Sequence, residues 1–304
     1  MNAAVDMGDR QRWRGEYRRD EPLARHCTWR CGGTADHFFA PAERTELSRF
    51  LASAAVDPLF WLGFGSNVLV RDGGLRGTVI ATTGLTAFAW QDAHLLYAEA
   101  GVSCARLARL AAAQDRAGLE FLAGIPGSLG GALSMNAGAH GGAIWNFVAA
   151  AELIDRQGQV RSWRRADFQA DYRRVMAPQA GGYVGALLAL PDSADGLGST
   201  RIRQVLAQRN ATQPTGRATC GSVFKNPAGD YAGRLIEQCG LKGHRIGGAS
   251  VSMVHANFIV NEGRACAADI EQLIVYVGAT VRTATGIELE PEVLIVGAPA
   301  VTDP

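Results

Sequence analysis

Several features that would place the chain in a specialised class are missing from its sequence. It has no uninterrupted run of about 18 apolar residues, so a membrane-spanning helix is not expected. Basic and acidic residues nearly balance, 30 against 29, which gives no electrostatic reason to expect a nucleic acid or an anionic membrane as partner. No spacing of His, Cys and Asp residues supports a metal site, and none is predicted.

The six cysteines include no Cys-x-x-Cys pair, and we interpret them as reduced structural thiols, typical of a cytoplasmic protein. Residues 1–20 are polar and arginine-rich and lack the apolar segment of a secretory signal. They are therefore predicted to form a disordered extension. The full length of 304 residues is enough for two or three lobes with a sizeable core.

Hydrophobic periodicity predicts many short strands and a few amphipathic helices, without a regular βαβ alternation. The expected fold class is therefore α+β. A segment rich in Pro, Gly, Ser and Asp at 191–200 is the best linker candidate, and it places a domain boundary near residue 195. Strands are predicted at 36–40, 59–62, 68–70, 78–83, 95–101, 150–155, 160–163, 183–190 and 256–261, and helices at 43–54, 103–116, 200–211, 231–240 and 267–286.

The 37 glycines are clustered, and two of the clusters resemble ligand-binding loops. "GFGSNVLV" (63–70) can direct backbone N–H groups, Ser66 and Asn67 at a phosphate. It lacks the third glycine and the helix of a dinucleotide fingerprint, and a plain β-turn explains it equally well. "GIPGSLGGALSMNAGAHGG" (124–142) consists mostly of Gly and Ala, which lets a backbone approach a ligand closely. This second loop is predicted to hold the pyrophosphate of a cofactor.

A third motif, "CGSVFKNP" (220–227), places a hydroxyl, a cation and an amide close together. Pro227 prevents a continuing helix or central strand, so the segment is expected to be short and rigid. It would present Ser222, Lys225 and Asn226 to a ligand. Taken alone, Ser222 is better explained by a turn hydroxyl that bonds its own backbone.

Together these motifs resemble the UDP-N-acetylenolpyruvoylglucosamine reductase (MurB) family over nearly the whole chain, from about 25 to 297. The two glycine loops are similar to its flavin-binding motifs, and "TWRCGGTADHFFAP" (28–41) is similar to its N-terminal motif. "GSVFKNP", "AGRLIEQCGLKG" (232–243), "HANFIVN" (255–261) and "LEPEVLIVG" (289–297) resemble its C-terminal signature. His26, Met135 and Val175 depart from the residues that are usual in the family.

The resemblance implies a two-lobed FAD-binding domain of the vanillyl-alcohol-oxidase/PCMH type at 21–194 and a smaller α+β substrate-binding domain at 195–304. It implies non-covalent FAD, NADPH as co-substrate, and reduction of an enolpyruvyl ether of a UDP-sugar for peptidoglycan synthesis. The FAD-binding residues carried over are Gly63, Gly65, Ser66, Asn67, Gly124, Ile125, Pro126, Gly127, Ser128, Gly131, Ala132, Asn136 and Gly138.

The same resemblance assigns catalytic roles to Ser222 as proton donor, Arg173 as carboxylate ligand and Glu292 as catalytic glutamate. The alternation of Glu288, Glu290 and Glu292 places them on one face if the segment is a strand. Substrate contacts carried over are Tyr172, Lys225, Asn226 and Asn257.

Two other functions are compatible with parts of the sequence. A sugar or alcohol oxidase would share the flavin loops, but "GSVFKNP" and "LEPEV" argue against it. A non-catalytic nucleotide-sugar or flavin-binding protein would not need Ser222, Arg173 and Glu292 together. The protein is expected to act in the cytoplasm as a monomer.

Overall fold

The computed structural model describes residues 13–53, 58–139 and 141–300. Its contacts group the chain into two compact units. The first unit contains the N-terminal residues to Arg19 together with His37–Phe64 and Gly77–Ala207. The second unit is formed by Asp20–Asp36, Gly65–Arg76 and Gln208–Pro304.

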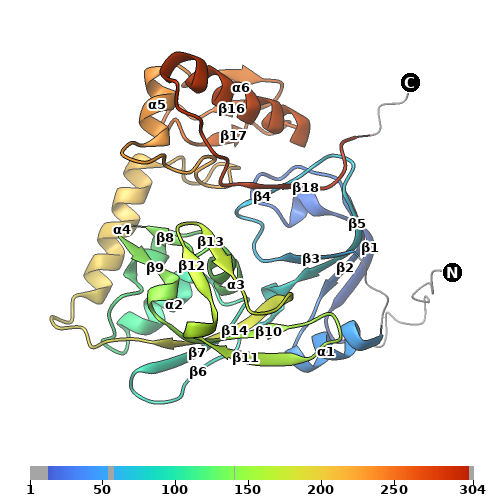
Figure 1. Ribbon diagram of the computed structural model, residues 1–304, viewed down its shortest axis with the longest axis vertical. Helices are drawn as coiled ribbons and strands as arrows, with labels where there is room; N and C mark the ends of the chain where they lie inside the picture. The colour runs from blue at the N-terminus through green and yellow to red at the C-terminus, as the bar shows by residue number, and fades with distance from the viewer. Residues whose placement is uncertain (1–12, 54–57, 140, 301–304) are drawn as a thin grey trace. The chain divides into compact units, whose positions relative to one another are not determined.

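The first unit is built around a five-stranded antiparallel sheet in the order β11-β10-β14-β7-β6 (Figure 1). Helix α3 (Leu129–Ser134) packs on β14 and β7, and α2 (Cys104–Ala112) buries Leu107 against the same core. Ser103 caps α2, because its side chain accepts from the backbone N–H of Arg106. The strands are β6 (Phe88–Trp90), β7 (Leu95–Glu99), β10 (Val148–Ile154), β11 (Val160–Arg164) and β14 (Gly182–Ala189).

A second sheet, most of whose strand residues belong to the first unit, has the order β1-β2-β5-β3. Helix α1 (Arg44–Ser53) supplies Phe50 to its core, where the ring stacks on Phe39 with centroids 4.0 Å apart. The strands are β1 (Glu16–Pro22), β2 (Thr34–Ala40), β3 (Leu59–Leu62) and β5 (Leu75–Ala81).

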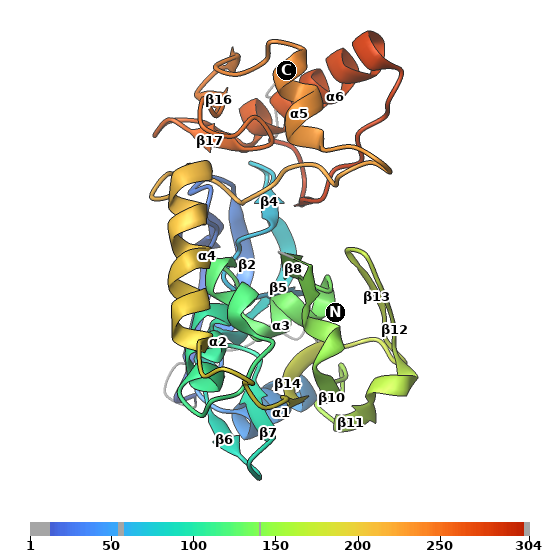
Figure 2. The ribbon, with the colours of Figure 1, turned by 90° about the vertical axis from the view of Figure 1, so that its left-hand side faces the viewer.

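The second unit contains a three-stranded antiparallel sheet, β15-β16-β17, against which α6 (Ala267–Thr285) packs (Figure 2). The apolar face of α6 buries Ile270, Leu273 and Val277, as its helical period predicts. Helix α5 (Ala232–Gln238) contacts α6 in the same core. The strands are β15 (Arg245–Ile246), β16 (Ala249–Val251) and β17 (Ile259–Asn261).

A discontinuous segment, 65–76, completes this second unit. Its strand β4 (Val68–Val70) pairs in parallel with β18 (Leu294–Val296). Asp72 accepts from the N–H groups of Ala267 and Ala268, both at 2.9 Å, and so caps the first turn of α6. Arg71 holds Glu271 of the same helix through two hydrogen bonds of 2.9 and 2.7 Å.

The structure describes several further elements. They are β8 (Gly138–Ala139), β9 (Gly142–Ala143), β12 (Gln169–Asp171), β13 (Arg174–Met176), α4 (Gly198–Thr212) and the 3-10 helices Leu23–Arg25, Thr82–Gly84, Glu120–Gly124, Ile144–Asn146 and Arg165–Asp167. No helix within the described ranges is both long and apolar enough to cross a bilayer.

The structure confirms the α+β class, and each predicted strand and helix overlaps an observed one. The predicted disordered extension is too long, since β1 already begins at Glu16; residues 1–12 lie outside the described part. Tyr17 explains the difference, because its hydroxyl bonds His37 Nδ1 at 2.8 Å and its ring stacks on that imidazole. The grouping by contacts changes between Ala207 and Gln208, inside α4, whereas the composition placed the boundary near 195.

Candidate active site

In the second unit, the "GSVFKNP" motif lies between two other segments of the chain. On one side, the N–H of Val223 donates to Asn257 O at 2.9 Å. On the other, the N–H of Glu292 donates to Val223 O at 2.7 Å, and an isolated bridge joins Phe224 to Pro291. The backbone thus brings the neighbour of Ser222 next to Glu292, although the two are far apart in sequence.

Asn257 is buried, with 3% of its surface exposed, and its side chain faces the same motif. Its Oδ1 accepts from the N–H of Phe224 at 2.9 Å, and its Nδ2 donates to Phe224 O at 2.9 Å. One side-chain amide therefore satisfies both backbone polar groups of Phe224, as a neighbouring strand would. The family resemblance predicts that Asn257 contacts the substrate. In the structure, its side-chain amide instead forms hydrogen bonds with the backbone of Phe224.

Glu292 is half-buried, and its backbone oxygen accepts from Asn67 Nδ2 at 3.0 Å. Burial and, secondly, the charge of Glu292 raise the pKa of the Cys220 thiol well above its ordinary value. The expected strand over 288–292 is absent, since β18 begins only at Leu294. Glu288 and Glu290 are nevertheless exposed while Leu289 between them is buried, as in an extended backbone.

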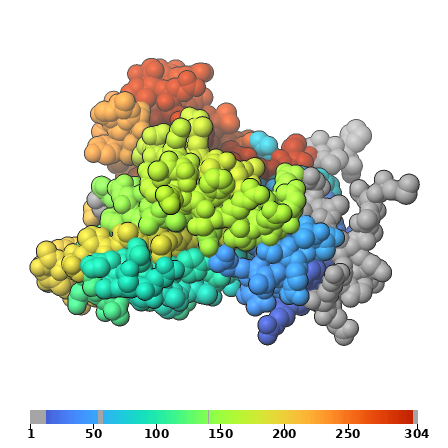
Figure 3. All heavy atoms as spheres, turned by 60° about the horizontal axis from the view of Figure 1, so that its bottom comes forward, coloured from blue at the N-terminus to red at the C-terminus, as the bar shows by residue number. Residues whose placement is uncertain are grey.

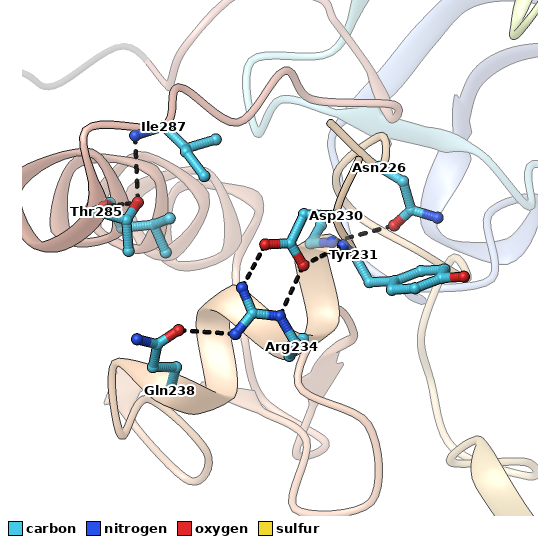
Figure 4. A network of polar contacts seen from close by, with 9 residues as sticks. Asn226, Asp230, Tyr231, Arg234, Gln238, Thr285 and Ile287 are labelled. Carbon is cyan, nitrogen blue, oxygen red and sulfur yellow. Dashed lines mark hydrogen bonds and ion pairs between the residues drawn. The ribbon is translucent and has the colours of Figure 1, made fainter. Parts of the chain in front are cut away.

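Lys225 and Asn226 both have protein partners. The backbone N–H of Lys225 donates to Glu290 O at 2.9 Å, and its Nζ forms an ion pair with the Glu290 carboxylate. Asn226 Oδ1 accepts from the N–H of Ala232 at 3.1 Å, at the start of α5 (Figure 4). The Nδ2 end of Asn226 points away from this helix in the same view. Lys225 is thus held beside Glu290, and Asn226 offers a donor to a ligand.

The start of α5 is fixed by a further ion pair. Arg234 forms an ion pair with Asp230. Its hydrogen bonds to the Asp230 carboxylate and, secondly, the hydrogen bond from the N–H of Tyr231 lower the pKa of this carboxyl to about 2. Asp230 Oδ1 accepts from the N–H of Tyr231 at 2.7 Å (Figure 4). The side chain of Tyr231 is exposed. These contacts order the residues that follow the "GSVFKNP" motif.

In the first unit, the second glycine loop runs from a 3-10 helix into α3. Ser128, 1% exposed, caps α3 by accepting from the N–H of Gly131 at 3.4 Å. An added Cβ at Gly63 would lie only 2.6 Å from Ser128 Oγ, so the end of β3 and this cap require a glycine between them. At Gly131 a Cβ would meet only Ser128 Oγ, at 3.7 Å, so the backbone there is open to a close ligand.

Arg173 lies in the turn between β12 and β13, in a left-handed conformation with φ of 55°. Its Nη2 donates to Gly138 O at 3.0 Å, and its guanidinium lies over the ring of Tyr172 with a Cζ–centroid distance of 5.4 Å. Asn136 Nδ2 donates to Asp171 O at 2.9 Å. The hairpin, in the yellow-green part of the surface in Figure 3, is therefore tied to the end of the second glycine loop.

The structure thus forms two groups of the predicted site residues, one in each unit. Sequence reasoning missed the pairing of Lys225 with Glu290 and the engagement of Asn257 with Phe224. An asparagine within the apolar run "HANFIVN" is the one signal that could have indicated a structural amide. Among the family departures, His26 Nε2 lies 2.9 Å from Glu21 Oε1. The described residues contain no group of three His, Cys, Asp or Glu side chains that could hold a metal.

Comparison with known proteins matches two family models to the chain. The model for the C-terminal domain of UDP-N-acetylenolpyruvoylglucosamine reductase covers residues 213–296, and an FAD binding domain model covers residues 35–163. These matches confirm the expected combination of an FAD-binding domain with a C-terminal domain of this type.

Proteins named UDP-N-acetylenolpyruvoylglucosamine reductase are similar along nearly their whole length. The one from Methylococcus capsulatus is 52% identical over 287 residues, covering 93% of this chain and 94% of the relative. The one from Alkalilimnicola ehrlichii is 51% identical, covering 93% and 95%. The crystal structure of MurB from Thermus caldophilus superimposes with a TM-score of 0.79 at 33% identity, covering 93% and 98%. The chain therefore belongs to the UDP-N-acetylenolpyruvoylglucosamine reductase (MurB) family.

Proposed function

We propose that this protein is an FAD-dependent oxidoreductase that reduces UDP-N-acetylenolpyruvoylglucosamine to UDP-N-acetylmuramate with NADPH, in peptidoglycan precursor synthesis. The observation that carries the proposal is the backbone pairing of the Ser222–Phe224 segment with the Glu292 segment, in a chain of this family. The printed names of the relatives from Methylococcus capsulatus and Alkalilimnicola ehrlichii support the proposed substrate. Each of these relatives is about half identical to this protein over most of the chain.

FAD fits the residues of the two glycine loops. The backbone at Gly131 is open to a close ligand, and Ser128 fixes the turn that precedes it. We assign FAD binding to the loop residues Gly63, Gly65, Ser66, Asn67, Gly124, Ile125, Pro126, Gly127, Ser128, Gly131, Ala132, Asn136 and Gly138. When bound, FAD supplies the capacity to accept hydride from NADPH and to give it to C3 of the enolpyruvyl group.

Hydride addition at C3 leaves negative charge on C2 and on the attached carboxylate, so the protein must supply a proton and cationic stabilisation. Ser222 donates the proton from its Oγ to C2, and Arg173 binds the carboxylate through its planar guanidinium. Glu292 stabilises the enol form of the reacting group. Preorganised groups of this kind stabilise the transition state because they need not rearrange as charge develops.

The remaining polar groups bind the nucleotide-sugar. Lys225 Nζ contributes a positive charge for the diphosphate, and it must release the Glu290 carboxylate to do so. Asn226 donates through its Nδ2, and the exposed ring of Tyr172 provides an apolar contact. NADPH and nucleotide-sugars are cytoplasmic metabolites, which supports a cytoplasmic site of action; a monomeric state stays a prediction that sedimentation analysis can check.

Anaerobic stopped-flow spectroscopy of the two half-reactions tests the proposal. NADPH should bleach the flavin absorbance, and the enolpyruvyl substrate should restore it. Neither simple sugars nor air should restore it at a comparable rate. Reoxidation by air or by a sugar at the faster rate would favour an oxidase instead, and a flavin that NADPH fails to reduce would contradict the proposal.

A further inference from the structure

The segment that carries Ser222 has no continuous strand beside it on the Asn257 side. One backbone hydrogen bond, from the N–H of Val223 to Asn257 O at 2.9 Å, is followed by two bonds from the Asn257 side chain to Phe224. The side-chain amide therefore continues the pairing by one residue where the neighbouring backbone turns away. The turn leads into β17, which starts at Ile259.

The opposite edge of the same segment is held by backbone hydrogen bonds and by the Lys225–Glu290 ion pair. Glu292 N–H donates to Val223 O at 2.7 Å and Lys225 N–H donates to Glu290 O at 2.9 Å. A segment that is held on both edges has little freedom to slide or rotate, whereas one that is held on a single edge can shift more easily. For a proton donor this freedom matters, since a displacement of about 1 Å can cost on the order of 100-fold in rate.

We infer that Asn257 is a positioning residue, which fixes Ser222 relative to Glu292 through the two hydrogen bonds to Phe224, and that it does not itself contact the substrate. The inference rests on the proposed function, because it assigns proton donation to Ser222. Asn257 is 3% exposed, and both functional ends of its amide are engaged by Phe224. These two bonds leave one Nδ2 hydrogen and one Oδ1 lone pair of the amide, but a side chain that is 3% exposed presents little of its surface to a ligand.

The chain offers a matched control in Asn261, at the end of β17. This residue is also buried, at 7% exposure. Its Nδ2 donates to Trp29 O at 2.8 Å, and its Oδ1 accepts from the N–H groups of Gly263 and Ala265 at 2.8 and 3.0 Å. It has the same chemistry and the same kind of backbone partners as Asn257, but it does not contact the Ser222 segment through its side chain.

The test compares Asn257→Asp with Asn261→Asp in the FAD-loaded full-length protein. Each change keeps the side-chain volume and one acceptor but removes the donor, so both variants should lose stability to a similar extent in thermal unfolding. In Asn257→Asp, flavin reduction by NADPH should stay within about threefold of the parent, while reoxidation by the enolpyruvyl substrate should fall on the order of 10- to 100-fold. In Asn261→Asp, both half-reactions should stay within about threefold.

Substrate affinity separates positioning from direct contact. The Kd of the oxidised protein for the substrate, from titration of the flavin spectrum, should be nearly unchanged in Asn257→Asp. A Kd raised by tenfold or more would make Asn257 a substrate ligand and overturn the inference. It would be overturned equally if reoxidation in Asn257→Asp matched Asn261→Asp, or if both half-reactions fell together.

Two further results keep the test decisive. If the enolpyruvyl substrate fails to reoxidise the flavin of the parent protein, the proposed function itself is refuted. This outcome is distinct from a failure of the inference about Asn257. If Asn257→Asp does not fold, Asn257→Ser, a small neutral replacement, is compared with Asn261→Ser by the same measurements and the same criteria.

Discussion

Asn67 and Glu292 are joined by a hydrogen bond of 3.0 Å from the side-chain amide of the first to the backbone oxygen of the second. The backbone continues the link, since the N–H of Leu294 donates to Asn67 O at 3.0 Å. The first glycine-rich segment therefore supports the backbone at Glu292 from within the second unit. This gives Asn67 a structural task in addition to the flavin contact that we propose for it.

Replacing Ser222 by alanine should uncouple the two half-reactions. The change removes one oxygen from a segment whose backbone is held on both edges, so thermal stability should change little. Flavin reduction by NADPH needs no proton from Ser222 and should persist. Reoxidation by substrate should slow on the order of 10²–10⁴-fold, the usual contribution of a general acid. Anaerobic stopped-flow traces measure both steps, and reoxidation within about tenfold of the parent would rule out Ser222 as the donor.

Glu292→Gln should also act on the second step alone. The substitution keeps the side-chain shape and the backbone bond to Val223 O, and it removes the carboxylate charge. NADPH should reduce the flavin at a nearly normal rate, while turnover with the enolpyruvyl substrate falls by at least about tenfold. An equal loss in both steps would mean that Glu292 supports the cofactor or the fold.

Glu290→Gln should tighten binding of the nucleotide-sugar. The Glu290 carboxylate pairs with Lys225 in the ligand-free chain and would compete with a diphosphate for that cation. Because 71% of the Glu290 side chain is exposed, the pair contributes at most about 1 kcal/mol, so affinity should improve by no more than about fivefold. Calorimetric titration with UDP measures the change. A weaker affinity would instead indicate that Glu290 orients Lys225 for the ligand.

The FAD should be released when the protein is precipitated with acid. No cysteine lies in either glycine loop, and the one histidine, His140, lies outside the described residues. The yellow colour should therefore appear in the supernatant. Colour that stays in the pellet would demonstrate a covalent link and would favour an oxidase.

The cysteines should divide into two classes in reaction with a thiol reagent. Burial raises the pKa of Cys27 from 9.0 to about 11 and that of Cys104 to about 12. At pH 8 these thiols carry almost no thiolate, so the exposed Cys266 should react first, and the buried thiols only after denaturation.

The raised pKa values of Cys27 and Cys104 also predict how the stability of the fold depends on pH. A thiol that is harder to ionise in the folded state contributes fully below its unfolded pKa, and this contribution is lost as the pH rises toward 11–12. The midpoint temperature of thermal unfolding should therefore decrease as the pH is raised above 9.

For the thiol reaction, rapid modification of all six cysteines in the native protein at pH 8 would contradict the burial of Cys27 and Cys104.

The sequence predicted most elements that have a clear period, and it failed where long-range contacts decide. The face of α6 with Ile270, Leu273 and Val277 follows from the helical period. Helix α3 was hidden, because Gly130 and Gly131 have poor helix propensity and only the Ser128 cap and the packing on β14 and β7 stabilise it. Strand β18 was missed because its three residues pair with β4, which lies at the other end of the sequence.

The site residues divide in the same way, into those that a local motif predicts and those that depend on long-range contacts. The motifs identified Ser222, Lys225 and Glu292, since each lies in a short signature of distinct composition. Partners such as Glu290 for Lys225 and Phe224 for Asn257 depend on how segments pair in space, and no local pattern encodes that pairing. Roles inferred from a motif alone therefore need the contacts before they can be divided into ligand-binding and supporting residues.

The segment 65–76 has a consequence for the order in which the chain assembles during synthesis. It is made early, yet its strand β4 finds a partner only in Leu294–Val296, and Asp72 caps a helix that starts at Ala267. The pairing of β4 with β18 cannot form until residues 294–296 have left the ribosome. Until then the apolar side chains of Leu69 and Val70 lack the neighbouring strand, so the pairing of β18 with β4 is a late step in the folding of this unit.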